Sequence, residues 1–241
     1  MRRTLLTFTG APILVINSGV FPTEQELNFC RNLDTRDHLG DDNAASNAIK
    51  LSKESNLLSN YTELDRIKDL LLNCFNDYVD NILEIENQFY MCNSWCTIQK
   101  KGDFHPSHTH PNAIFSAVYY AKSDKSILKF STVKSRIQES FYFEYKIKKH
   151  NIFNSSGWRL QVNSGDVVIF PGDLNHESLI LQDEQERIII ACSFFAKGFF
   201  GRNDNYNDIL SYDHAKVDTY LKFYGYKLLF EGKRKAVYLY K

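Results

Sequence analysis

The sequence reads GDFHPSHTHP from Gly102 to Pro111 and continues into an apolar, aromatic run, AIFSAVYY, from Ala113 to Tyr120. Three of the chain's seven histidines lie in this short stretch. The apolar run predicts a buried β-strand. His108 and His110 are two residues apart, so on an extended backbone both imidazoles leave the same face. This spacing predicts a β-scaffold that presents two nitrogen ligands to one metal ion.

Two further polar residues extend this pattern. His176 begins the run HESLIL, shortly after the turn residues 171–173, where it can supply the third ligand of a metal site. Arg187 opens the run RIIIACSFF, and a buried arginine is costly unless it meets an anion such as a carboxylate. His105 stands an odd number of residues before His108 and is followed by a proline, so we expect its ring to point elsewhere. The alternative interpretation of the stretch is a polar loop with surface histidines.

The composition excludes several classes of protein. The 241 residues suffice for one large domain with a sizeable core. Basic and acidic residues number 29 each, so no net charge favours binding to nucleic acid or to an anionic membrane, and we expect neither partner. The five cysteines match no zinc-binding spacing, which predicts free thiols in a reducing setting. No apolar run reaches the length of about 18 residues that a membrane span needs, and we expect a cytoplasmic location.

Short apolar runs separated by turn residues dominate residues 88–200. Five or more such runs at close spacing predict an antiparallel sandwich or jelly roll. Within this core, residues 132–156 are charged and aromatic and predict a long hairpin or a loop over the site. Residues 201–241 follow as a tyrosine-rich C-terminal extension, in which a basic turn between two apolar runs predicts a β-hairpin.

Residues 1–87 predict a strand and helices that pack on this core. Thr23, with Glu26 three residues later, is the expected N-cap of a first helix that runs to about Leu33. Apolar residues then recur at three- and four-residue steps from 62 to about 85, which predicts a long helix with one packing face. Residues 34–61 lack clean periodicity and predict a loop, a second candidate lid.

From roughly residue 88 to 196 the sequence resembles the 2-oxoglutarate- and Fe(II)-dependent oxygenases of the prolyl-hydroxylase-like branch. More narrowly, it resembles a group of bacterial and phage-encoded members of that superfamily. The resemblance implies a mainly β fold with flanking helices (α+β), whose core is a double-stranded β-helix. It rests on these motifs: SW at 94–95, GDFHPSHTHP at 102–111, FSAVYY at 115–120, GDVVIFP at 165–171, and His176 with Arg187.

The family's H-x-D…H…R pattern falls on His108-x-His110, His176 and Arg187. By this resemblance His108 and His176 are iron ligands, Arg187 binds the distal carboxylate of 2-oxoglutarate, and Tyr119 is a further contact to that co-substrate; His110 is the candidate third ligand. The sequence departs from the family at His110, which occupies the usual carboxylate position of the ligand set. A third imidazole can complete the set. Alternatively the position binds water or another ion, or a carboxylate reaches in from Asp103 or Asp173.

The activity implied by the resemblance is a hydroxylase that requires Fe(II), 2-oxoglutarate and O2. It couples the decarboxylation of 2-oxoglutarate to succinate with hydroxylation of a C–H bond. The substrate would be a prolyl or other residue of a peptide or protein, or a small molecule, and the C-terminal extension could support a homodimer. Two rival interpretations are a three-histidine, cupin-type dioxygenase or isomerase that does not use 2-oxoglutarate, and a non-catalytic jelly-roll binding module. Arg187 argues against the first, because such sites need no anion-binding arginine.

Overall fold

The computed structural model of the chain forms two compact units, one of residues 1–86 and 91–195 and the other of residues 87–90 and 196–241. The first unit contains the predicted N-terminal region and nearly all of the predicted core. None of the described helices is both long and apolar enough to span a lipid bilayer. The structure describes residues 2–8, 11–37, 49–111, 113–131, 146–150, 154–155, 157–182, 186–197, 201–202, 205–206, 226–232 and 235–240.

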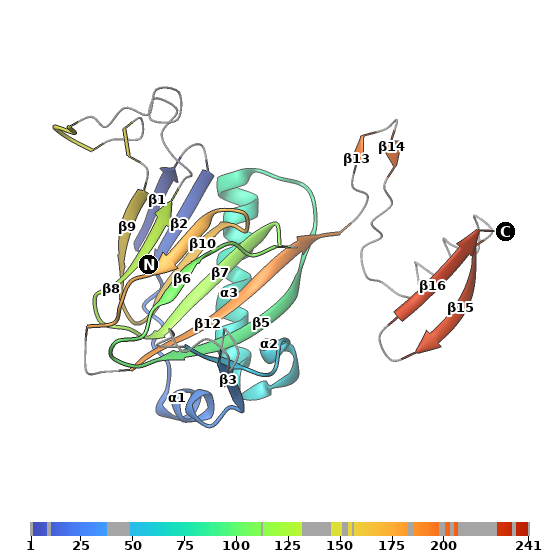
Figure 1. Cartoon of the computed structure of the whole chain (residues 1–241), viewed down its shortest axis with the longest axis horizontal. Helices are drawn as coiled ribbons and strands as arrows, with labels where there is room; N and C mark the ends of the chain where they lie inside the picture. Colours follow the sequence, from blue (N-terminus) through green and yellow to red (C-terminus); the bar gives the residue numbers. More distant parts are fainter. Residues whose placement is uncertain are drawn as a thin grey trace. The chain divides into compact units, whose positions relative to one another are not determined.

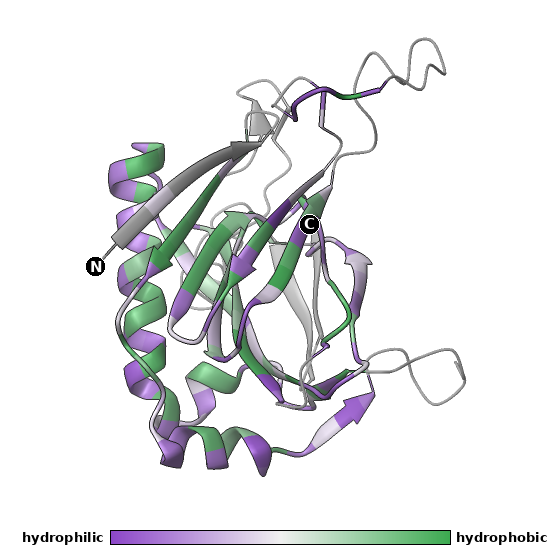
Figure 2. Cartoon of the chain, turned by 90° about the vertical axis from the view of Figure 1, so that its left-hand side faces the viewer, coloured by the Kyte–Doolittle hydropathy of each residue, from purple (hydrophilic) through white to green (hydrophobic). Residues whose placement is uncertain are grey.

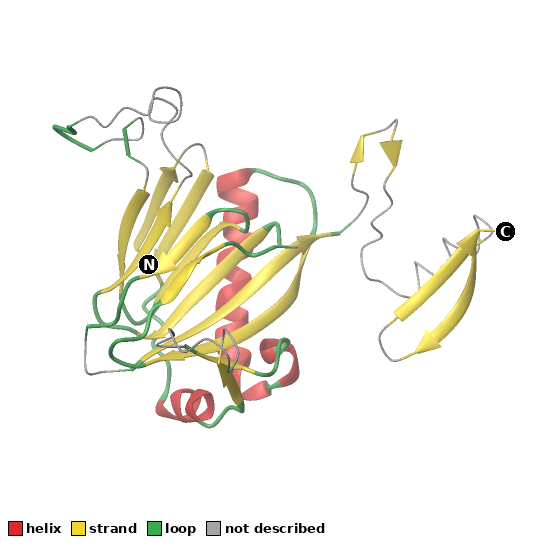
Figure 3. Cartoon of the chain, viewed as in Figure 1, coloured by secondary structure: helices red, strands yellow, loops and turns green. Residues whose placement is uncertain are grey.

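Two largely antiparallel sheets build the first unit (Figures 1 and 3). The larger sheet has the strand order β1-β2-β10-β7-β12-β5-β4-β3, and the smaller sheet has the order β6-β11-β8-β9. Strands that are neighbours in a sheet are often far apart in the chain, as expected of a jelly roll. This is the double-stranded β-helix with flanking helices that the sequence predicts. The strands are β1 (Arg2–Phe8), β2 (Ala11–Asn17), β3 (Thr35–Asp37), β4 (Lys50–Ser52), β5 (Phe89–Gln99), β6 (His105–His108), β7 (Phe115–Lys122), β8 (Ser126–Ser131), β9 (Gly157–Val162), β10 (Asp166–Pro171), β11 (Asn175–Ser178) and β12 (Arg187–Ala196).

Strand β7 is buried along almost its whole length, because both of its faces are covered. On one face Val118 and Tyr120 pack in a core cluster with Leu128 and Phe130 of β8. The same cluster holds residues of β2, β9, β10 and β12, so it fills the space between the two sheets. The opposite face of β7 is covered by the helical layer. Burial on both faces explains why the run FSAVYY shows no alternation of apolar and polar residues.

The longest helix, α3 (Asp65–Asp77), covers the outer face of the larger sheet. The ring of Phe75 stacks on that of Phe194 in β12, with centroids 3.5 Å apart. Figure 2 shows α3 alongside strands that are mostly apolar. A 3₁₀ turn (Thr62–Leu64) precedes α3 and a π-helical segment (Tyr78–Leu83) continues it, so the helix predicted over 62–85 is confirmed with irregular ends. The other helices are α1 (Glu24–Arg31) and α2 (Leu57–Asn60).

The predicted start of α1 is confirmed. The hydroxyl of Thr23 accepts a hydrogen bond from the amide of Glu26 at 3.1 Å, and the carboxylate of Glu26 accepts one from the amide of Thr23 at 2.6 Å. This reciprocal pair satisfies two amides that the first turn leaves unpaired. Glu26 also binds the guanidinium of Arg66, which lies in α3. Glu26 therefore links the start of α1 to α3, the helix that covers the sheet.

The prediction of a loop over 34–61 was wrong for much of that segment. Strands β3 and β4 pair with each other, and Lys50 of β4 pairs with Ile98 of β5, so they extend the larger sheet at its edge. These strands are three residues each, too short for a periodic apolar pattern to reveal them. Residues 38–48 lie outside the described residues, as do 132–145, 151–153 and 156 of the other candidate lid.

The second unit contains two hairpins. Strand β13 (Gly201–Arg202) pairs with β14 (Asn205–Tyr206), and β15 (Tyr226–Gly232) pairs with β16 (Lys235–Tyr240). Both pairs are antiparallel. The second pair falls on the stretch where the sequence predicts a hairpin.

Candidate metal centre

Three histidines from the smaller sheet and its adjoining loop meet at one point. Antiparallel pairing of β6 with β11 places His108 opposite His176. His110 follows the end of β6, and its amide donates a hydrogen bond to the carbonyl of Gly172 in the turn before β11, at 2.8 Å. One ring nitrogen of each histidine lies within 4.8 Å of those of the other two. The structure therefore brings together all three histidines that the sequence singled out.

The hydrogen bonds of the three rings favour metal binding. The Nδ1 atoms of His108 and His176 lie 2.8 Å and 2.9 Å from the backbone carbonyls of Pro106 and Leu174. Because a carbonyl only accepts, Nδ1 carries the proton in each ring, and Nε2 keeps its lone pair. Nδ1 of His110 is hydrogen-bonded to the hydroxyl of Ser116. Each ring is thus held from behind by oxygen and keeps its other nitrogen for a ligand.

The electrostatics keep two of these imidazoles, those of His110 and His176, neutral. Burial, together with the neighbouring His176 and His108, lowers the pKa of His110 to about 3. Burial and the neighbouring His108 lower the pKa of His176 to about 4. Unprotonated imidazoles are good ligands for divalent transition metals. The donor set therefore fits Fe(II), and by the same chemistry it also fits nickel or zinc.

No carboxylate completes this ligand set among the described residues. The only group of metal-ligating side chains there is the three histidines. Asp173 is exposed, and the carboxylate of Asp103 accepts a hydrogen bond from the amide of Lys100 at 2.7 Å. Of the alternatives that the sequence left open, the geometry favours His110 itself at the usual carboxylate position.

A cavity of about 40 Å³ adjoins the histidines, and Arg187 lines it. The side chain of Arg187 is 2% exposed, and burial lowers its pKa. Its Nε donates to the side-chain oxygen of Gln99 at 2.7 Å, and its Nη2 donates to the hydroxyl of Ser178 at 2.9 Å. Because a guanidinium keeps its proton even when buried, the cavity contains a positive charge. The structure thus places a buried positive charge beside a candidate metal site.

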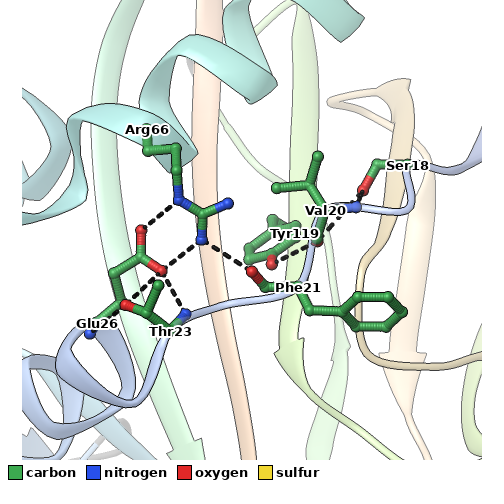
Figure 4. Close-up of polar contacts among 7 residues, drawn as sticks. All are labelled: Ser18, Val20, Phe21, Thr23, Glu26, Arg66 and Tyr119. Atoms are coloured by element: carbon green, nitrogen blue, oxygen red, sulfur yellow. Dashed lines mark hydrogen bonds and ion pairs between the residues drawn. The ribbon is translucent and has the colours of Figure 1, made fainter.

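The structure does not support Tyr119 as a co-substrate contact. Successive residues of a strand point to opposite faces, and Tyr119 points away from the cavity. Its hydroxyl donates to the carbonyl of Val20 at 2.9 Å, beside the network of Glu26 and Arg66 (Figure 4). Tyr120, the next residue, lines the cavity with Arg187. Of the two tyrosines on this strand, Tyr120 lines the cavity and Tyr119 does not.

The expectation for His105 was also wrong. His105 lines the cavity, and its ring stacks on that of His108 with centroids 3.9 Å apart. The cause is an irregular register between the two strands. Ser178 pairs with His105 and His176 with His108, so three steps along β6 match two along β11. This bulge brings residues an odd number apart to the same face.

Three further residues that line the cavity, Trp95, Thr97 and Ser178, were missed by sequence reasoning, as was Gln99, which binds Arg187. Trp95, Thr97 and Gln99 alternate along β5, and Ser178 lies two residues after His176 on β11. The edge of the Trp95 ring meets His110, with centroids 5.2 Å apart. The period of two was a usable signal for Ser178, because it must share a face with His176. The residues of β5 gave no such signal, since no metal ligand lies on that strand.

Solved structures share this fold at low sequence identity. HygX from Streptomyces hygroscopicus, with nickel and 2-oxoglutarate bound, superposes with a TM-score of 0.52 at 14% identity, over 81% of this chain and 91% of that one. A prolyl-4-hydroxylase from Pseudomonas putida gives a TM-score of 0.50 at 13% identity, over 77% and 93%. The α-ketoglutarate-dependent epimerase SnoN from nogalamycin biosynthesis gives a TM-score of 0.52 at 8% identity, over 76% of this chain and 77% of that one. A comparison with curated protein sequences found no significant match.

Fold and site together define a double-stranded β-helix protein with a three-histidine cluster beside a buried arginine. Residues 93–193, which include every cavity residue discussed above, match the family described as "Putative 2OG-Fe(II) oxygenase". Over this stretch the chain matches the 2-oxoglutarate- and Fe(II)-dependent oxygenases, a class of enzyme that uses Fe(II), 2-oxoglutarate and O2. The predicted class of enzyme and its cofactors are confirmed.

Proposed function

We propose that this chain is a hydroxylase whose Fe(II) is held by His108, His110 and His176 and whose 2-oxoglutarate is anchored by Arg187. The observation that carries this proposal is the placement of three imidazoles, each held through Nδ1, beside a buried guanidinium. The two ends of one keto acid can then be bound at once. Its keto-carboxylate end faces the metal site, and its distal carboxylate faces Arg187.

The charge of the site supports a dianionic co-substrate. Three neutral imidazoles leave the two positive charges of Fe(II) uncompensated, and Arg187 adds a third. A dianion such as 2-oxoglutarate offsets most of this charge in a buried site, where uncompensated ions are costly. A neutral ligand would leave the cavity strongly positive. The usual aspartate would remove one charge, so its replacement by His110 strengthens the requirement for an anionic ligand.

The protein's own side chains orient the reactants and exclude water. Bound Fe(II) supplies the oxidative chemistry with O2 and 2-oxoglutarate. The backbone carbonyls behind His108 and His176 fix the directions of these rings, so the ligand geometry exists before the metal binds. Trp95 closes one side of His110, and Phe170 packs edge-on against His176 with centroids 4.7 Å apart. These aromatic walls keep bulk water from the ligands.

An anaerobic Fe(II) titration, with and without 2-oxoglutarate, tests the assignment through visible absorption. We expect a charge-transfer band that requires the keto acid. It should be lost in His176→Ala, which loses a ligand, and in Arg187→Met, which loses the anion site but keeps the metal site. Iron binding without a keto-acid-dependent band would contradict the role of Arg187 and favour a three-histidine, cupin-type site. Absence of specific iron binding would contradict the ligand assignment.

We propose further that the substrate is a small apolar residue of a peptide or protein, with proline as the first candidate. The support is the apolar lining of the cavity next to the histidines, and the similar fold of a prolyl-4-hydroxylase. The apolar side chains that line the cavity are Trp95, Val118, Ile127, Leu128, Ile189 and Ala191.

Peptides that contain proline, each paired with its alanine counterpart, test the substrate class. We expect proline-dependent release of succinate and a gain of one oxygen atom in the peptide, detected by mass spectrometry. Equal turnover with the alanine peptides, or turnover only with small molecules, would contradict the proposal.

A further inference from the structure

The buried guanidinium of Arg187 is surrounded by neutral partners. Among the described residues its hydrogen bonds go to the Gln99 amide, the Ser178 hydroxyl and, weakly, the Leu179 carbonyl, and no carboxylate forms a salt bridge with it. The acidic group that acts on it through space is Asp103, whose carboxylate is engaged by a backbone amide. A buried charge without a counter-ion is costly, and the fold retains it.

Gln99 is held at both ends of its side-chain amide. Its oxygen accepts from Nε of Arg187 at 2.7 Å, and its nitrogen donates to the hydroxyl of Ser178 at 3.3 Å. The same hydroxyl accepts from Nη2 of Arg187 and from the backbone amide of His105. The three side chains therefore form a closed triangle, with Gln99 and Arg187 buried and Ser178 partly buried, that fixes the plane of the guanidinium.

A glutamate at position 99 would hold Arg187 more strongly than the amide does. The two side chains have nearly the same shape, and a carboxylate would make a charge-assisted pair with the guanidinium. It would also neutralise the positive charge. The amide orients the guanidinium and leaves its charge for a ligand.

Two polar groups beside the cavity have no hydrogen-bond partner among the described residues. Among the described residues, Nη1 of Arg187 makes no hydrogen bond, and the buried hydroxyl of Thr97 has no partner. Thr97 and Tyr120 line the cavity with Arg187. A carboxylate bound there could accept from Nη1 and from a hydroxyl, which a methyl group could not do.

We propose that Gln99 is a positioning and specificity residue, which orients Arg187 while leaving its charge uncompensated, so that the site selects keto acids with a second carboxylate. This inference rests on the proposed function of Arg187. It assigns to β5 a role in choosing the co-substrate, although that strand supplies no metal ligand.

The test compares 2-oxoglutarate with 2-oxopentanoate, which has the same keto-acid head and lacks the distal carboxylate. Dissociation constants are measured anaerobically on the Fe(II)-loaded full chain, for the natural protein and for Gln99→Glu. We expect Gln99→Glu to weaken 2-oxoglutarate binding by about 10- to 100-fold, the value of one or two charge-assisted hydrogen bonds. Binding of 2-oxopentanoate and of Fe(II) should change by less than about twofold, since neither depends on the free charge of Arg187.

Gln161→Glu is the matched control, because Gln161 is exposed on β9 and the substitution adds the same charge there. It should leave both affinities unchanged. If Gln99→Glu does not fold, Gln99→Met is the substitute, since it removes the hydrogen bonds without adding charge. In that variant the affinity for 2-oxoglutarate relative to that for 2-oxopentanoate should fall by about 3- to 10-fold. An unchanged ratio in whichever Gln99 variant folds would overturn the inference while the proposed function stands. Failure of the natural protein to bind 2-oxoglutarate would overturn both.

Discussion

Gly172 is the position where a single methyl group should disturb the metal site most clearly. It lies in the turn between β10 and β11, and its backbone is joined to the segment that carries His110 by two hydrogen bonds, of 2.8 Å and 2.9 Å. A Cβ atom at Gly172 would lie 2.4 Å from the carbonyl oxygen of Ala113. Cβ atoms do not approach other atoms closer than 3.0 Å, so Gly172→Ala must separate the two segments by about 0.6 Å.

This displacement acts directly on the ligand geometry. His110 and His176 lie on the two segments that are forced apart, and metal sites tolerate misplacement of only about 0.5 Å. We expect Gly172→Ala to lower the affinity for Ni(II) by about tenfold or more, and the free energy of unfolding by about 1–3 kcal/mol, as in other overpacked sites. Calorimetric titration of the metal-free protein and urea unfolding measure the two effects.

Gly19→Ala separates loss of the site from general destabilisation. Gly19 has a φ of +70°, so a side chain there strains the backbone, but no atom lies within 4 Å of the added Cβ. Gly19→Ala should lower the free energy of unfolding by about 1–2 kcal/mol and leave the affinity for Ni(II) unchanged. Equal affinities for Ni(II) in Gly172→Ala and the natural protein would refute the idea that this close approach sets the ligand geometry.

Three further predictions concern the surroundings of the site. Tyr119→Phe should lower the free energy of unfolding in urea by about 1 kcal/mol and leave the affinity for 2-oxoglutarate unchanged. Tyr120→Phe should weaken that affinity several-fold. The reverse pattern would restore the original assignment of Tyr119 as the co-substrate contact. Burial raises the pKa of Glu26, but hydrogen bonds from Arg66 and Thr23 outweigh it and hold that pKa below its usual value. Glu26→Gln should therefore lower the free energy of unfolding by about 1–3 kcal/mol at pH 7. Because the pKa is lowered, the difference should be lost only as pH falls below the ordinary glutamate value of 4.5; a constant difference would contradict this. The metal-free protein should lose stability as pH falls from about 6.5 towards 4, because the unfolded chain binds protons that the folded chain excludes. The free energy of unfolding should fall by up to about 1.4 kcal/mol per pH unit for each of His110 and His176. A free energy of unfolding in urea that does not change with pH would contradict the neutral state of these two rings.

The fold could be predicted from sequence wherever one local pattern determined the structure. The capping pair of Thr23 and Glu26 predicted the start of α1, and apolar spacing predicted α3. Strands β3 and β4 could not be found in this way. They exist because β5 offers them an edge to pair with, and such tertiary pairing leaves little trace in a three-residue segment.

The candidate site could be predicted as far as residue type and chain order allowed. His108 and His110 were identified from their two-residue spacing, His176 from its place after a turn, and Arg187 because a charge is costly within an apolar run. Their neighbours depended on register. A bulge in β6 turned His105 into the cavity, and the alternation of β7 placed Tyr120 there in place of Tyr119. Gln99 was missed because its role depends on contact with a residue 88 positions away.

A crystal structure of the chain loaded with Ni(II) and 2-oxoglutarate would test the central claim most directly. The account predicts one metal ion bound by Nε2 of His108, His110 and His176, with no carboxylate of the chain among its ligands. The distal carboxylate of 2-oxoglutarate should lie against Arg187. A metal ion bound by only two of these histidines, or by an aspartate of the chain, would contradict the assignment of His110 and the charge argument that follows from it.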